Sequence, residues 1–248
     1  LPNVLYLYML RPELKEFEID LKPLPTNYEK YYANSGIVRA RRGRWSYTLL
    51  KNNSSFLFLH NGNVRCYVKL CASFFAKGQF KATTLDKTES GYRMSYSAKG
   101  FYRMPFEQPP ETSDWWKMDH NLRDIVNELE LNFDVIIREV EDGLELHVIT
   151  DGCDRVPVKL EIGFTANTWI ESESFMFKGN PGEDMVLKDG FVQVRKGKDC
   201  IIVGPGFGKH SYTWDMRGSE PKSPYDFTIY MTEFTNIDKK ISIIPKEL

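Results

Sequence analysis

Short runs rich in Val, Ile, Phe, Tyr and Thr recur along the chain from Asn34 onward, separated by Gly, Asn and Asp. The first four runs are GIVRAR, WSYTLLK, SFLFLH and VRCYVKL, and the turns RRGR, NNS and HNGN lie between them. The Asn61-Gly62 pair in the last of these turns is typical of a two-residue hairpin. The pattern therefore predicts four antiparallel strands joined by tight turns.

The second half of the chain repeats this pattern. LNFDVIIREVEDGLELHVITDG predicts two strands joined at Asp142-Gly143, and Asp189-Gly190 predicts another hairpin. Further runs follow from VPVKLEIGF to KKISIIP, at a spacing of about 8–12 residues that is typical of a sandwich or a barrel. The predicted strands outnumber those of an immunoglobulin domain. We therefore expect an all-β fold, a large antiparallel β-sandwich of two stacked sheets.

One segment departs from the strand pattern. HNLRDIVNEL, residues 120–129, has apolar side chains at a helical spacing, namely Leu122, Ile125, Val126 and Leu129. We therefore expect at most one or two short helices, one of them in this segment.

Residues 1–33 are punctuated by proline, at positions 2, 12, 23 and 25. Proline and the residue before it favour extended backbone, so this segment is predicted to be a linker. One β-sandwich domain is predicted to follow it, over residues 34–248. The chain opens LPNVLYLYMLRPELKEF, without an initiator Met or the basic flank of a signal peptide. The chain is then either a mature protein or a piece of a longer one, and we expect the piece.

Composition limits the class of protein. With 42% hydrophobic and 14% aromatic residues, the 248-residue chain is not globally disordered and has enough apolar surface for a core. It contains no run of about 18 apolar residues, so we expect no membrane span. The cysteines are too few for a disulfide scaffold and lack CxxC spacing. We expect core residues or free thiols at Cys66, Cys71, Cys153 and Cys200.

Charge is distributed unevenly although the net charge is only −1. Residues 34–85 contain nine Lys and Arg and no Asp or Glu. One interpretation is a basic surface that binds an acidic polysaccharide through Arg39, Arg41, Arg42 and Arg44. The other is that these bases pair with acids on neighbouring strands. Nucleic acid is not expected as a partner, because the chain is not basic overall and has no nucleic-acid-binding motif.

The segment SDWWKMDHNLR, residues 113–123, is the first candidate site. Trp115 and Trp116 would point to opposite faces of a strand, so one of them is expected to be exposed. A flat indole suits the C–H face of a sugar, and His120 could bond to a hydroxyl or a carboxylate. The alternative is that both indoles are buried and cap one end of the sandwich.

The second candidate site is the Gly- and Pro-rich stretch of residues 204–226, predicted to be a long loop. His210 and Tyr212 are candidate bases for removing the C5 proton of a uronic acid. Trp214 could stack on a sugar ring, and Arg217 could hold the carboxylate. Glu220 and Asp226 could instead form a glycosidase pair. The remaining alternative is a crossover loop whose Trp plugs the sandwich.

Motifs for metals and cofactors are absent from the sequence. The four histidines are scattered, at positions 60, 120, 147 and 210, with no HExxH or H-x-H spacing. There is no Walker A loop, Rossmann glycine pattern or GxSxG elbow. We therefore predict no metal and no cofactor.

Two stretches carry a family resemblance. YYANSGIVRARRGRWSYTLL, after a Pro-rich start, and the later GKHSYTWDMRGSEPKSPYDFTIYMTEF resemble the C-terminal β-sandwich of heparinase II/III-like polysaccharide lyases. The resemblance covers most of residues 30–245. It implies a supersandwich-like fold, contacts to an acidic polysaccharide and a periplasmic or secreted location. In that family an α/α toroid usually precedes the sandwich and holds most catalytic residues, so this chain would be the part without the toroid.

Other functions stay open on the sequence alone. A self-contained glycoside hydrolase or sugar isomerase could use the loop of residues 204–226. A surface protein that binds sugar without chemistry is the remaining alternative.

Overall fold

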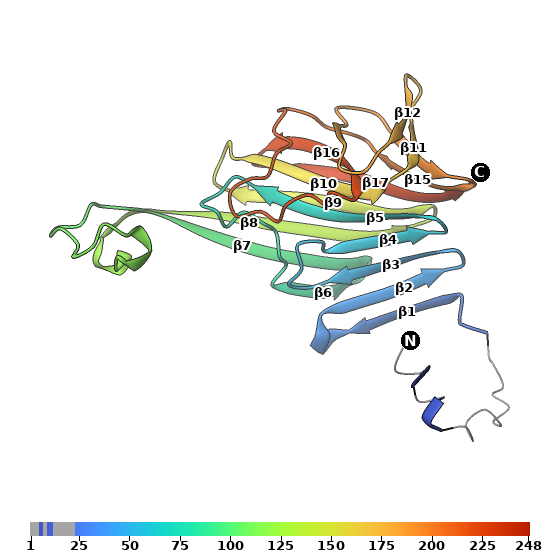
Figure 1. Ribbon diagram of the computed structural model, residues 1–248, viewed down its shortest axis with the longest axis horizontal. Coiled ribbons are helices and arrows are strands. Elements are labelled where there is room, and N and C mark those ends of the chain that lie inside the picture. Colours follow the sequence, from blue (N-terminus) through green and yellow to red (C-terminus); the bar gives the residue numbers. More distant parts are fainter. Residues whose placement is uncertain (1–4, 7–8, 12–22) are drawn as a thin grey trace.

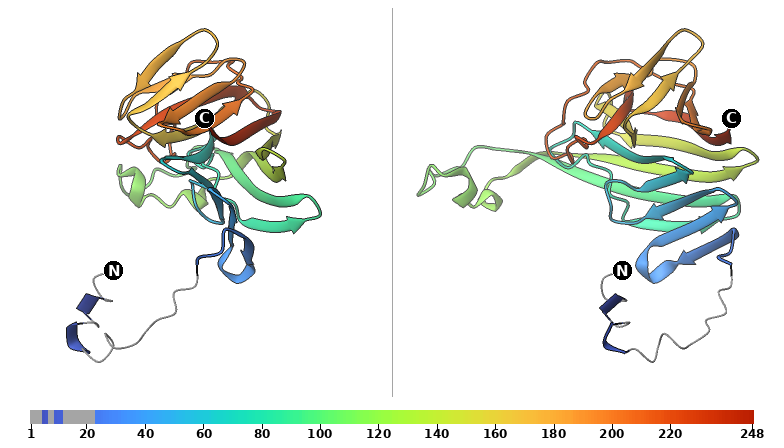
Figure 2. Two further views of the ribbon diagram at one scale, coloured as in Figure 1. Left: turned by 90° about the vertical axis from the view of Figure 1, so that its right-hand side faces the viewer. Right: turned by 45° about the vertical axis from the view of Figure 1, so that its right-hand side comes forward.

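The computed structural model describes residues 5–6, 9–11 and 23–248. Within these residues the chain forms two stacked sheets of eight and nine strands (Figures 1 and 2). All strand pairs are antiparallel except one, which confirms the predicted two-sheet β-sandwich. No helix among the described residues is long and apolar enough to cross a bilayer.

The eight-stranded sheet contains the four strands predicted from the first half of the chain, now β2 to β5. The two-residue turn between β4 and β5 is Gly62-Asn63, one residue later than predicted, because Asn61 pairs with Val64. In sheet order its strands are β1 (Asn27–Tyr32), β2 (Ile37–Arg42), β3 (Trp45–Leu50), β4 (Leu57–Asn61), β5 (Val64–Ala72), β10 (Pro157–Thr165), β16 (Asp226–Phe234) and β13 (Asp184–Val186).

The nine-stranded sheet is built mostly from the second half of the chain. In sheet order its strands are β12 (Met176–Gly179), β11 (Thr168–Glu171), β14 (Val192–Lys196), β15 (Asp199–Gly204), β17 (Asp238–Glu247), β9 (Gly143–Gly152), β8 (Ile125–Val140), β7 (Gly91–Arg103) and β6 (Thr84–Thr88).

Two predicted turns need correction. Val140 pairs with Gly143, so the β8–β9 hairpin turns at Glu141-Asp142 rather than at Asp142-Gly143. The prediction of a hairpin at Asp189-Gly190 is wrong, because β13 and β14 belong to different sheets. This turn instead carries the chain from one sheet to the other.

The predicted boundary between a linker and the sandwich is also wrong. Residues 27–32 form β1, which pairs with β2 along its whole length. Tyr31 explains the attachment: its ring packs edge-on against Tyr92, and its hydroxyl donates to the carbonyl of Leu85 at 2.5 Å. The sandwich therefore starts at Asn27, while residues 1–4, 7–8 and 12–22 of the predicted linker lie outside the described residues.

The helix predicted at residues 120–129 does not form. Residues 115–117 and 120–122 make single 3-10 turns, and β8 begins at Ile125. From there the chain pairs with β7, placing Leu129 opposite Gly100. The hydrogen bonds of this strand pair override the helical spacing of the apolar residues.

The hydrophobic core lies between the two sheets. Phe56 and Phe80 pack edge-to-face with ring centroids 5.0 Å apart, and Phe133 approaches Phe80 from the facing sheet at 6.2 Å. Burying a side chain of this size stabilises the fold by about 1.5–3 kcal/mol. The cysteines are free thiols, as predicted, and burial raises the pKa of Cys66 to about 12.

Strands β7 and β8 extend beyond the sandwich as a two-stranded arm, which projects to the left in Figure 1. Residues 104–124 join the two strands at its tip. Tyr102, Met104, Ile125 and Val126 are exposed on the arm, whereas Phe133 and Val135 of the same β8 are buried. The arm therefore carries apolar side chains that the core does not cover.

Candidate functional site

The segment Ser211–Tyr225, here called the covering loop, lies on the outer face of the eight-stranded sheet. It belongs to the connection between β15 and β16. Its backbone touches β10 near Trp214 and β5 near Pro221. The loop therefore covers a part of the sheet that would otherwise face solvent.

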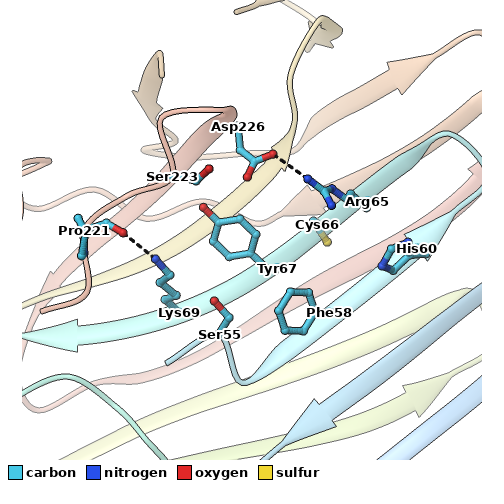
Figure 3. A pocket seen from close by; sticks show the side chains of 10 residues that line it. All are labelled: Ser55, Phe58, His60, Arg65, Cys66, Tyr67, Lys69, Pro221, Ser223 and Asp226. Carbon is cyan, nitrogen blue, oxygen red and sulfur yellow. Dashed lines mark hydrogen bonds and ion pairs between the residues drawn. The ribbon is translucent and has the colours of Figure 1, made fainter. Parts of the chain in front are cut away.

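A pocket of about 310 Å³, here called the Arg65 pocket, lies beside the second limb of the covering loop (Figure 3). Arg65 and Tyr67 project into it from β5, and Arg65 contacts Asp226 at 3.4 Å. The Tyr67 ring lies directly over Gly163, where a Cβ atom would come within 2.1 Å of it. Glycine in the middle of β10 thus makes room for the aromatic wall of this pocket.

Three charged side chains are buried beneath the covering loop. Lys69 on β5 lies opposite Glu161 on β10, and Lys159 precedes Glu161 by two positions on the same face. Lys159 is 1% exposed and Glu161 is 3% exposed. The Glu161 carboxylate lies 3.4 Å from the Lys69 ammonium and 4.0 Å from that of Lys159. Burial raises the pKa of Glu161, although the two ammonium groups act in the opposite direction.

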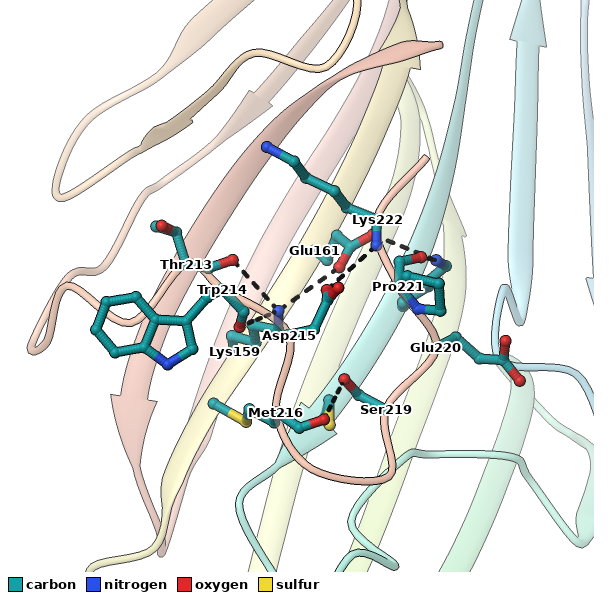
Figure 4. A network of polar contacts seen from close by, with 12 residues as sticks. Lys159, Glu161, Thr213, Trp214, Asp215, Met216, Ser219, Glu220, Pro221 and Lys222 are labelled. Carbon is teal, nitrogen blue, oxygen red and sulfur yellow. Dashed lines mark hydrogen bonds and ion pairs between the residues drawn. The ribbon is translucent and has the colours of Figure 1, made fainter. Parts of the chain in front are cut away.

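The buried lysines hold the covering loop by its backbone (Figure 4). The Lys159 ammonium donates to the carbonyl of Trp214 at 3.0 Å, and the Lys69 ammonium donates to the carbonyl of Pro221 at 2.9 Å. Across the loop, the Lys222 amide donates to Asp215 at 3.3 Å. Charge-assisted bonds of this kind are stronger than neutral ones, so both limbs of the loop are fixed on the sheet.

The first limb of the loop lines a second pocket of about 300 Å³, here called the Trp214 pocket. It brings together three residues predicted from the sequence, Tyr212, Trp214 and Arg217. The Trp214 side chain is 66% exposed, and its ring lies 5.2 Å from that of Tyr212. Arg217 is exposed and has no hydrogen bond or ion pair with any described residue. The alternative, a Trp that plugs the sandwich, is therefore wrong.

His210 does not fit the predicted role of a base. Its Nε2 lies 3.0 Å from the carbonyl of Val158 and 3.1 Å from that of Glu233, so this nitrogen carries the proton and donates. Its Nδ1 accepts from the Tyr212 amide at 3.3 Å. With both ring nitrogens bonded to backbone, His210 ties the loop to β10 and β16.

The predicted glycosidase pair is also not supported. The Glu220 carboxylate pairs with Lys81 at 2.8 Å and lies on the surface. Asp226 is buried at the start of β16, where it contacts Arg65. Each carboxylate is therefore neutralised by its own base rather than facing the other across a cleft.

The tryptophans of the first candidate site lie at the tip of the arm. Trp115 and Trp116 belong to a 3-10 turn instead of a strand, and both are exposed, Trp116 by 87%. The alternative of two buried indoles is therefore wrong. His120 packs against the Trp115 ring at 4.1 Å, and its Nε2 lies 2.8 Å from the Trp115 carbonyl.

The base of the arm and the Trp214 pocket lie at the same end of the sandwich. The Tyr102 ring on the arm packs against Phe75 at 5.1 Å. The next residue, Ala76, contacts the covering loop at Gly218, where a Cβ atom would lie 2.1 Å from the Ala76 carbonyl oxygen. A chain of direct contacts thus joins strand β7 of the arm to the covering loop.

The fold places the four predicted binding arginines in two different environments. Arg42 makes a two-pronged ion pair with Glu139, at 2.5 and 2.8 Å, and Arg44 pairs with Asp199. For these two the alternative of pairing across strands is correct. Arg39 and Arg41 instead lie on the outer face of the sheet and have no acidic partner among the described residues.

Sequence reasoning missed Lys69, Lys159 and Glu161. The alternation of polar and apolar residues in VRCYVKL and VPVKLEIGF does place them on the outer face, which was the available signal. Their burial comes from a loop more than fifty residues away from Lys159 in the chain, at Thr213 and Trp214. The pattern of residues within a strand does not predict that a distant loop will cover it.

Metal ligands do not gather in the part of the chain that the structure describes: no three His, Cys, Asp or Glu side chains are placed to hold an ion. His147 pairs with Asp238 at 2.5 Å. Burial lowers the pKa of His60, and the nearby guanidinium groups of Arg39 and Arg65 lower it further.

Comparison of the chain with protein-family models, with curated proteins and with solved structures finds no match. The fold itself defines the class: an all-β protein made of two stacked, mainly antiparallel sheets. In this chain a loop is held over buried charges on one sheet, with a pocket along each of its limbs.

Proposed function

We propose that this chain is a carbohydrate-binding β-sandwich that contributes contacts to an acidic polysaccharide. The Trp214 pocket is the observation that carries this proposal, because it combines an exposed indole, a phenol and a guanidinium that has no ion pair with any described residue. The resemblance of the sequence to the sandwich of heparinase II/III-like lyases supports the same ligand class. On this proposal the protein works in the periplasm or outside the cell.

Each side chain of the pocket has a role in this binding. The flat face of Trp214 covers the C–H surface of a sugar ring, and Tyr212 extends that apolar surface. Arg217 holds the sugar carboxylate through two parallel hydrogen bonds, which Lys could not reproduce. Because Lys159 already fixes the backbone at Trp214, little conformational freedom is lost on binding.

The proposed role is binding, with no proton abstraction by His210. A base must have a free nitrogen within reach of the proton, and both nitrogens of His210 are bonded to backbone. In heparinase II/III-like lyases the toroid usually holds most of the catalytic residues, which agrees with a sandwich that supplies contacts.

Trp214→Ala and Arg217→Lys are each expected to weaken the binding of a uronate oligosaccharide by about tenfold or more, or about 1.4 kcal/mol. The melting temperature is expected to stay nearly constant, because both side chains are exposed. Titration calorimetry measures the affinity and a thermal scan measures the stability.

Trp116→Ala is the matched control, since it removes an even more exposed indole, at the tip of the arm. Unchanged affinity in both Trp214→Ala and Arg217→Lys would overturn the proposal. New ultraviolet absorbance from an unsaturated uronate would show instead that the chain itself catalyses β-elimination.

A further inference from the structure

The outer face of strands β1 to β5 gathers basic and aromatic side chains that are far apart in the sequence. Directly opposite residues of paired strands share a face, so Arg41, Ser46, His60 and Arg65 form one row across the sheet. A second row beside it contains Arg39, Phe58 and Tyr67. On β1, Tyr28 extends the first row and Lys30 extends the second. We call this surface the basic outer face: Tyr28, Lys30, Arg39, Arg41, Phe58, His60, Arg65 and Tyr67.

The charge of this face is largely uncompensated. Arg39 bonds to the Thr48 hydroxyl at 2.6 Å, and Arg41 bonds to the Gly43 carbonyl at 3.0 Å. Neither has an acidic partner among the described residues, in contrast to Arg42 on the opposite side of the same strand. Arg65 contacts Asp226 at 3.4 Å and is still more than half exposed.

Two pockets open on the basic outer face. One is the Arg65 pocket, where Phe58 and Tyr67 pack with ring centroids 6.3 Å apart. The other, of about 260 Å³, lies beside β1 and is lined by Tyr28, Tyr32 and Arg41 among others. Each pocket thus combines aromatic rings with a guanidinium. Four steps of about 4.8 Å between strands separate β1 from β5, which gives a span of about 19 Å.

We infer that the basic outer face is a second binding surface, on which an extended acidic polysaccharide lies across strands β1 to β5 with one acidic sugar in each pocket. It extends the proposed function to a surface that does not include Trp214. Polysaccharide is favoured over nucleic acid because the chain carries a net charge of −1, whereas nucleic-acid-binding domains are usually strongly basic.

The test compares a triple variant, Arg39→Ser with Arg41→Ser and Arg65→Ser, with the unchanged chain. Each substitution removes a guanidinium that bonds to the ligand, so the affinity for long-chain polyuronate or heparin should fall about 10- to 100-fold. Binding by the unchanged chain should weaken as salt rises, because charges are screened within about 10 Å at 0.1 M and about 3 Å at 1 M. Calorimetry gives the affinities, and thermal scans confirm that the variants fold.

The matched control removes three exposed bases outside this face: Lys117→Ser with Arg155→Ser and Lys196→Ser. An equal loss in this control would overturn the inference, since it would reveal an effect of overall charge. Binding of single-stranded DNA as tightly as polyuronate would also overturn it.

Trp214→Ala separates the two binding proposals. If this variant keeps its full affinity while the triple variant loses it, binding at the basic outer face is supported and binding at the Trp214 pocket is overturned. If Trp214→Ala loses affinity and the triple variant does not, the basic outer face is overturned.

Discussion

Replacing Lys159 with Met is expected to lower the free energy of unfolding by about 3–5 kcal/mol. The Lys159 ammonium is buried and donates to the carbonyl of Trp214 at 3.0 Å. Met keeps much of the volume but leaves this carbonyl without its donor. It also leaves Lys69 as the one described ammonium group that pairs with the buried Glu161 carboxylate. The covering loop should therefore loosen as well.

Urea unfolding measures this loss, and cleavage of the folded protein within residues 211–225 reports on the loop. Lys209→Met is the matched control, because Lys209 is exposed and should change the stability by less than about 0.5 kcal/mol. The double variant Lys159→Met with Glu161→Gln should recover part of the stability, because Glu161 keeps only one of its two ammonium partners in Lys159→Met and its buried charge is then less well compensated. A double variant no more stable than Lys159→Met would contradict this coupling.

Asp199→Ala is expected to lower the free energy of unfolding by about 2–4 kcal/mol at neutral pH. Asp199 is buried at the start of β15 and accepts from both the backbone amide and the side chain of Asn63 at 2.8 Å. It also pairs with Arg44. Arg44 directly precedes β3, and Asn63 directly precedes β5. These bonds therefore join the nine-stranded sheet to the eight-stranded sheet, and their loss weakens the contact between the two.

The same site gives a signed dependence on pH. The bonds from the Asn63 amide, the Arg44 guanidinium and the Asn63 side chain lower the pKa of Asp199 below its ordinary value of 3.8. Because the pKa of Asp199 is lower in the folded protein than in the unfolded chain, this stabilisation is complete at a pH above the unfolded-state pKa. It is lost as the pH falls through the folded-state pKa. Stability measured in acid should therefore fall less steeply for Asp199→Asn than for the unchanged chain. Parallel curves would show that Asp199 contributes nothing to the acid sensitivity.

The strands were predictable where the alternation of apolar and polar residues and the positions of turn residues indicated the same strand boundaries. GIVRAR, WSYTLLK, SFLFLH and VRCYVKL all became strands because each alternates a core-facing set with an outward set. The helix at residues 120–129 was predicted wrongly for a related reason. On the arm the outer side chains of β8 face no core, so their apolar spacing carries no information about burial.

Only the loop residues of the candidate site were predictable from the sequence. Composition alone singled out Tyr212, Trp214 and Arg217, which do line one pocket. The basic surface needed the register of the strands as well. Arg41 and Arg42 are adjacent in sequence, yet Arg42 pairs with Glu29 and with the distant Glu139, whereas Arg41 has no acidic partner among the described residues.

The arm divides β8 into two parts with different local stability. Near Val135 the strand is covered by the core, so its amides exchange with solvent only when the sandwich itself opens. Near Ile125 it is half of an isolated two-stranded ribbon, which is marginally stable in water. Protection of the amide protons should therefore decline steadily from the base of the arm to its tip. A single strand would thus report both the global unfolding of this protein and its local fraying.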